Sequence, residues 1–106
     1  GTVTCRYSCV QGGYPGDNNL TNDPLFVDTA YLHLKSMAGY YFGGYFIGGD
    51  WTTGAEDSPL IDKGDPTADY QLEPRPNGDR LNMGAYGNTP VASKANRRLA
   101  TVIIIL

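Results

Sequence analysis

Apolar and polar residues alternate along two short stretches of the chain. In residues 2–10 one face of an extended strand carries the apolar side chains, Val3, Cys5, Tyr7 and Cys9. In residues 31–35 the alternation places Leu32 and Leu34 in a core and leaves the solvent side to Tyr31, His33 and Lys35. A period of two indicates β-strands that bury one face. We therefore expect His33 to be a surface residue.

Shorter apolar runs recur, each followed by an aspartate and a turn. The runs are Leu25–Val27 before Asp28 and Leu60–Ile61 before Asp62. Residues 58–87 combine the second run with Gly-Asp-Pro, Pro-rich and Asn-Gly turn signals. Short strands that turn after three or four residues suit a coil of stacked rungs better than long hairpins.

Residues 37–51 are rich in glycine and aromatic residues and have no clear period. Two structures stay open for this stretch. It forms a loop whose rings cover the end of a core, or a hairpin that turns at Gly43-Gly44. In that hairpin, Tyr41 and Phe42 pair with Tyr45 and Phe46 across the turn.

Composition limits the size and class of the protein. The chain has 106 residues, of which 14 are Gly, 7 are Pro and 8 are Tyr, as expected of one small turn-rich domain. The formal net charge is −3, so we expect no nucleic-acid partner. The opening residues lack the pattern of a signal peptide, and the apolar segment Thr101–Leu106 is too short to span a membrane.

Five motifs appear in order along the chain: NDPLFVD (22–28), YLHLKS (31–36), SPLIDKGDP (58–66), EPRPNGDRLNMGAYG (73–87) and TPVASK (89–94). Together they resemble the C-terminal part of bacterial right-handed parallel β-helix repeat proteins of the secreted or surface type. The family often has Cys at the place of Leu60, Arg at that of Tyr40 and Asp at that of Gly54. The tail from residue 96 onward matches nothing in that family.

The resemblance implies an all-β fold, a short right-handed parallel β-helix-like stack with an irregular C-terminal cap. The unmatched tail, residues 96–106, is expected to serve as an inter-subunit strand. Under the resemblance, residues 1–95 would form the last rungs and the cap, and the location would be secreted or at the cell surface. The resemblance also implies a core that contains Leu60, Ile61, Leu81 and Met83, and turns or close backbone approaches at Gly64, Gly78, Gly84 and Gly87. An open stack exposes strand edges, so we expect a homo-oligomer that forms through them, with Thr101–Leu106 as one pairing element.

Three aspartates are candidate catalytic acids, because β-helix glycosidases act through pairs of carboxyl groups. They are Asp57, Asp62 and Asp65. The alternative is that Asp62 and Asp65 accept backbone N–H bonds in turns, as Asp often does, and the spacing does not separate the two roles. Cys5 and Cys9 would lie roughly 13 Å apart on one strand, too far for a disulfide, and we interpret them as small apolar residues. No metal or cofactor is expected.

The aromatic residues of the glycine-rich stretch are the candidate ligand contacts. Tyr40, Tyr41, Tyr45 and Trp51 would stack on the apolar faces of an oligosaccharide if they are exposed. A small core or an oligomer interface is the alternative. The sequence therefore favours a non-catalytic domain that acts by binding, with carbohydrate as one ligand class, or by self-association. The second hypothesis is that the chain is part of a carbohydrate-active enzyme of the polysaccharide lyase or glycosidase kind.

Overall fold

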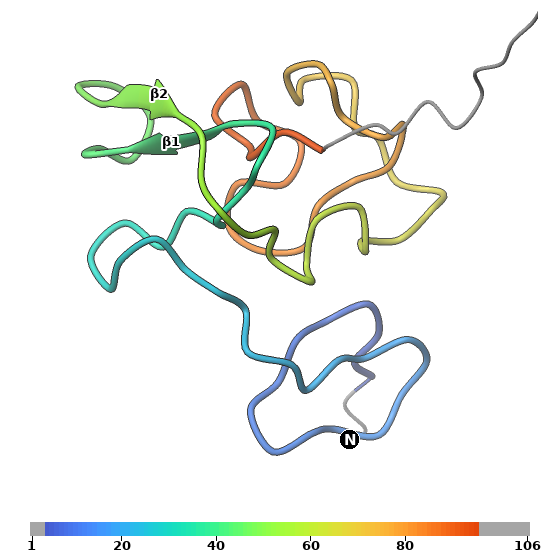
Figure 1. The fold of residues 1–106 in the computed structure, drawn as a ribbon. Coiled ribbons are helices and arrows are strands. Elements are labelled where there is room, and N and C mark those ends of the chain that lie inside the picture. The colour runs from blue at the N-terminus through green and yellow to red at the C-terminus, as the bar shows by residue number, and fades with distance from the viewer. Residues whose placement is uncertain (1–3, 96–106) are drawn as a thin grey trace, which may run out of the picture.

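The computed structural model describes residues 4–95, and nearly all of them lie in turns and loops (Figure 1). Strand β1 (Tyr40–Phe42) and strand β2 (Asp50–Thr52) form one antiparallel two-stranded sheet. In its register Tyr41 faces Trp51 across the two strands. The described residues contain no helix. The tail that we expected to pair between subunits, residues 96–106, lies outside the described residues.

The predicted parallel β-helix-like stack is wrong. Within residues 4–95 the single sheet is antiparallel, and parallel pairing is limited to the isolated bridge between Cys9 and Leu20. A second isolated bridge joins Phe26 and Leu34 and is antiparallel. The stretches predicted as rungs therefore pair at single residues and do not continue as ladders.

Left-handed backbone conformations interrupt the predicted strands. The φ angles of Tyr7, Leu25 and Leu32 are 51°, 54° and 62°, although none of these residues is glycine. A left-handed residue turns the chain and ends the alternation of side chains between two faces. As a result, Leu32 is 40% exposed whereas His33 is 1% exposed. The prediction of His33 as a surface residue is therefore wrong.

The hairpin predicted as one of two structures for residues 37–51 does form, but with a wider turn. Residues 43–49 connect β1 to β2, so Tyr41 pairs with Trp51 and not with a residue next to Gly44. The turn is anchored by His33, because His33 Nε2 donates to the Gly44 carbonyl oxygen at 2.8 Å.

Two apolar clusters form the core. Leu34, Leu60 and Met83 make the first, and it is packed by partly buried side chains, Tyr7, Cys9, Leu20 and Ile61. The second contains Tyr41, Tyr86 and Val91. In this second cluster, the ring of Tyr86 stacks on the ring of His33, with their centroids 3.7 Å apart. The expectation that Leu60 and Met83 lie inside is confirmed.

Turn glycines in the central stretch behave as the sequence predicts. Gly78 and Gly84 have positive φ angles of 61° and 105°. A Cβ atom would lie within 3 Å of a backbone carbonyl oxygen at the other two positions, 2.8 Å from Leu81 at Gly64 and 2.5 Å from Asn82 at Gly87.

Buried serines hold distant loops together. The hydroxyl groups of Ser36, Ser58 and Ser93 donate to backbone carbonyl oxygens that lie 58, 34 and 59 residues away, those of Lys94, Pro24 and Leu34. All three serines are at most 4% exposed. Ser36 also accepts the backbone N–H groups of two following residues at 3.1 Å each. These side chains take the place of a continuous sheet.

Replacing Ser36 with alanine should lower the free energy of unfolding by about 1–3 kcal/mol, because two N–H groups and one carbonyl, all buried or partly buried, lose their partner. Urea unfolding followed by Trp51 fluorescence measures the change. The matched control is Ser8→Ala, since the Ser8 hydroxyl bonds only the carbonyl of Arg6 two residues earlier. Equal stabilities for the two variants would contradict the bridging role of Ser36.

Candidate functional site

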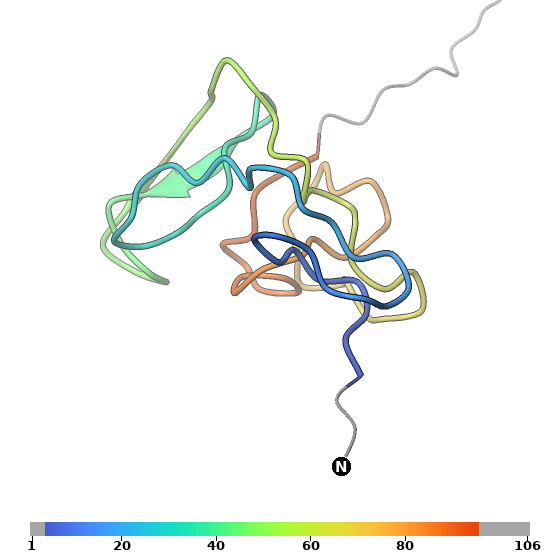
Figure 2. The ribbon, with the colours of Figure 1, turned by 90° about the horizontal axis from the view of Figure 1, so that it is seen from below.

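An apolar cleft lies between the N-terminal loops and the central part of the chain. Its volume is about 730 Å³ and its floor is formed by Leu60 and Met83, two residues of the first core cluster. Figures 1 and 2 show the N-terminal loops as a separate layer of coil beside the later residues. The remaining apolar side chains along the cleft are those of Tyr7, Cys9, Pro24 and Phe26, and the polar ones are those of Ser8, Gln11, Thr21, Asn22 and Asp23.

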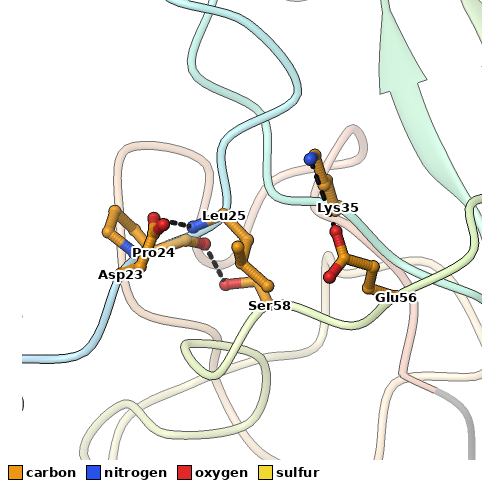
Figure 3. A network of polar contacts seen from close by, with 6 residues as sticks. All are labelled: Asp23, Pro24, Leu25, Lys35, Glu56 and Ser58. Carbon is orange, nitrogen blue, oxygen red and sulfur yellow. Dashed lines mark hydrogen bonds and ion pairs between the residues drawn. The ribbon is translucent and has the colours of Figure 1, made fainter.

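The wall at residues 23–26 is fixed by short-range and long-range bonds (Figure 3). Asp23 Oδ1 accepts the backbone N–H of Leu25 at 2.9 Å. The Pro24 carbonyl accepts the hydroxyl of Ser58, which is close in sequence to the cleft floor. Next to these bonds Lys35 Nζ lies 3.5 Å from a carboxylate oxygen of Glu56. This exposed ion pair adds little stability, so the buried serine is the main link.

The opposite wall depends on Asn19. Its side-chain amide donates to the carbonyls of Cys5 and Tyr14 at 2.9 and 3.0 Å. Its Oδ1 accepts the backbone N–H of Ser8 at 3.0 Å. Asn is suited to this place because it carries both a donor and an acceptor. The N-terminal loop is thereby closed around one polar side chain.

Both walls present unused backbone hydrogen-bonding groups. In the two isolated bridges the bonds are made by the residues that flank Cys9 and Phe26. The N–H and C=O groups of Cys9 and Phe26 themselves bond no other described residue. When the backbone N–H and C=O of an extended residue point away from its bridge partner, they form an edge to which a further strand can add.

The candidate catalytic aspartates mainly serve the backbone. Asp57 is exposed, and its Oδ1 accepts the backbone N–H of Met37 at 2.7 Å. Asp65 Oδ1 accepts the backbone N–H and the hydroxyl of Thr67 at 2.9 and 2.7 Å. These bonds, the one from the Thr67 N–H first, hold the pKa of Asp65 below its usual value. For Asp65 this arrangement is the turn role that is the alternative to catalysis, whereas the bond of Asp57 joins segments twenty residues apart.

Asp62 is the exception, because it lies close to a second acid that sequence reasoning missed. Burial raises the pKa of Asp62 to about 6, and the charge of Glu73 adds to the rise. Glu73 is 3% exposed, and its Oε2 accepts the backbone N–H groups of Asn82 and Asn88 at 2.9 and 3.0 Å. One oxygen of each carboxyl group, Asp62 Oδ1 and Glu73 Oε1, is buried without a partner. The two acids are eleven residues apart in the sequence, and only the folding of the loops brings them together.

Asp62 and Asp57 border a second, shallower cavity of about 340 Å³ that does not contain the floor of the cleft. Asp65 does not line it. Over residues 4–95, no three His, Cys, Asp or Glu side chains gather in a way that could hold a metal ion. A helix long and apolar enough to cross a membrane is likewise missing from that part of the chain.

The four predicted aromatic contacts differ in exposure. Tyr41 is 7% exposed and belongs to the second core cluster, whereas Tyr45 and Trp51 are 58% and 40% exposed. Tyr40 is half-buried. The hairpin therefore offers two of the four rings to solvent, and it also exposes Phe46 and Ile47.

Neighbouring rings of the hairpin meet edge to face and not in one plane. Tyr41 and Trp51 lie at 67° to each other, and Tyr45 lies at 79° to Tyr31. The Lys94 ammonium lies over Trp51, 4.8 Å from the ring centroid. A sugar could therefore stack on Tyr45 or on the other face of Trp51, but the rings do not form one flat platform. Carbohydrate binding stays a prediction.

Comparison of the chain with protein-family models, with curated proteins and with solved structures finds no match. The resemblance to β-helix proteins thus stays a prediction about ancestry, and the fold that it implied is corrected above. One feature of the sequence could have indicated the cleft: apolar residues lie on either side of the turn-rich segment 11–24. The sequence does not show that both walls leave backbone groups unpaired.

Replacing Asp62 with asparagine should make the protein more stable at pH 7. The folded-state pKa of about 6 exceeds the ordinary value of 3.8, so the native state loses stability as the pH rises from about 4 to 7. Asparagine does not ionise, so it avoids this loss of stability, and it tolerates the φ of 60° at this position. We expect a gain of about 1–3 kcal/mol in the free energy of unfolding at pH 7.

Urea unfolding at pH 4 and pH 7 measures the effect. The control is Asp65→Asn, which should give no gain at pH 7, because the pKa of Asp65 is lowered. If Asp62→Asn kept the wild-type pH dependence, the buried acid pair would have no part in stability.

Proposed function

We propose that the chain is a non-catalytic binding domain whose cleft holds an extended, apolar polypeptide segment as an added strand. The observation that supports this most is the combination of an apolar floor, Leu60 and Met83, with unpaired backbone groups at Cys9 and Phe26 on the walls. Strand addition uses these two features together: main-chain bonds supply affinity, and alternate side chains fill apolar pockets.

The size and the lining of the cleft fit such a ligand. A volume of about 730 Å³ lies within the range of roughly 300–1,000 Å³ that is usual for binding sites. Phe26 is 37% exposed at the cleft, so a bound apolar chain would remove ring surface from water. Covering a large apolar side chain completely is worth about 1.5–3 kcal/mol. A charged or strongly polar ligand would lose solvation at the same floor.

The enzyme hypothesis has less support from the same geometry. Asp23 is the one acidic residue that lines the cleft, and its Oδ1 already accepts a backbone N–H. His33 is fully buried outside the cleft lining. Asp62, the acid with the most perturbed pKa, borders the other cavity. The cleft thus contains binding groups but not a pair of acids or a nucleophile with a base.

A labelled peptide of alternating valine and threonine, flanked by lysines for solubility, should bind the protein saturably in a fluorescence anisotropy titration. The variant Phe26→Asp should weaken binding at least tenfold, because it places a charge in the apolar wall. The variant Leu72→Asp is the matched control, since Leu72 is 58% exposed and does not line the cleft.

A second peptide with proline at the central valine should bind much more weakly, because proline has no N–H for strand pairing. Equal binding of the two peptides would refute strand addition. Equal binding by the Phe26→Asp and Leu72→Asp variants would show that the cleft is not the site.

A further inference from the structure

The chain itself contains a segment with the chemistry that the cleft requires. Thr101–Leu106 has the sequence TVIIIL, with no charge, no proline and no glycine, and five of its six residues are β-branched. Such residues favour extended backbone. Six extended residues span roughly 20 Å, the length of an ordinary strand. The segment lies outside the described residues.

Opposite charge also favours binding of this segment to residues 1–95 of another molecule. Residues 1–95 contain six basic and eleven acidic side chains, a formal net charge of −5. Residues 96–106 contain two basic side chains, Arg97 and Arg98, and no acidic one. The arginines directly precede the apolar segment, and the cleft is bordered by Asp23. The basic residues would thus lie near Asp23, on a molecule whose residues 1–95 carry a net negative charge, when the apolar residues fill the cleft.

The position of Ala95 argues for a second copy as the source of the segment. Ala95 borders the shallower cavity together with Ile61 and Lys63, whereas Leu60 forms the floor of the cleft. The described chain ends on the side away from the N-terminal loops (Figure 1). The loop at residues 58–63 borders both cavities, and Ala95 lies on the shallower one. Residues 96–100 span roughly 17 Å when extended, and a neighbouring copy can bring its segment to the cleft without crossing that loop.

We infer that Thr101–Leu106 of one copy occupies the cleft of a second copy, and that the exchange is reciprocal. The inference rests on the proposed function, because it names the occupant of the same cleft. Reciprocal exchange makes a closed dimer with two-fold symmetry, in which every cleft is filled. A one-way exchange would instead continue from copy to copy and give open chains.

Size-exclusion chromatography with light scattering should give twice the monomer mass of 11.5 kDa for the full chain. The variant Ile104→Lys should return the mass to that of a monomer, because a charge cannot enter the apolar floor without loss. The matched control Leu72→Lys changes an exposed apolar residue away from the cleft and should stay dimeric. A full chain that is monomeric at high micromolar concentration would overturn the inference.

Cys9 provides a direct test, because it is a free thiol on the cleft wall. In a Cys5→Ser background, Ile103→Cys and Ile104→Cys are each treated with a mild disulfide-forming oxidant. We expect one of the two to give a covalent dimer on a non-reducing gel, since alternate residues of a strand face opposite sides. The bond should disappear when Cys9→Ser is added.

An intrachain disulfide, or no disulfide at either position, would overturn the exchange between copies. The peptide titration separates this failure from failure of the proposed function. If the Ile104→Lys variant is a monomer like the wild type and still binds the alternating peptide, the cleft takes strands but not this segment. If no peptide binds any variant, the proposed function itself is refuted.

Discussion

The need to satisfy backbone hydrogen-bonding groups without regular secondary structure governs this fold. Residues 4–95 contain two three-residue strands and no helix, so few peptide groups find partners in ladders. Buried polar side chains supply the missing partners, because an unpaired buried peptide group is costly. Ser36, Ser58 and Ser93 connect segments that lie 34 to 59 residues apart. Glu73 likewise accepts two N–H groups through one oxygen.

The same constraint determines where a ligand can bind. The walls of the cleft are held by Asn19 and Ser58, through bonds that run from side chain to backbone. Walls held in this way do not need to pair with each other, so Cys9 and Phe26 keep unpaired edges above an apolar floor. A sheet that crossed this place would have used those edges internally. The binding proposal and the irregular fold therefore have one physical cause.

The buried acids show how far side-chain bonding can compensate for burial. Two N–H bonds lower the pKa of Glu73, but burial has the larger effect and raises it. Asp62 has less compensation and reaches a pKa of about 6. The sequence nominated Asp62 together with Asp57 and Asp65. Asp65 makes a turn contact with Thr67, and Asp57 accepts the backbone N–H of Met37, twenty residues away. The true neighbour of Asp62 could not be predicted, because its proximity depends on how the loops fold.

Turns and the burial of single apolar residues could be predicted from the sequence, whereas the pairing of strands could not. The sequence determined the glycine turns, the burial of Leu60 and Met83, and the absence of long elements from residues 4–95, in a chain rich in Gly and Pro. Only the tertiary structure decided that the short apolar runs do not stack. Left-handed conformations at Tyr7, Leu25 and Leu32 are unfavourable for these residue types and persist only where surrounding contacts impose them. Alternation in a sequence predicts which residues could share a face, but long-range packing decides whether the backbone stays extended.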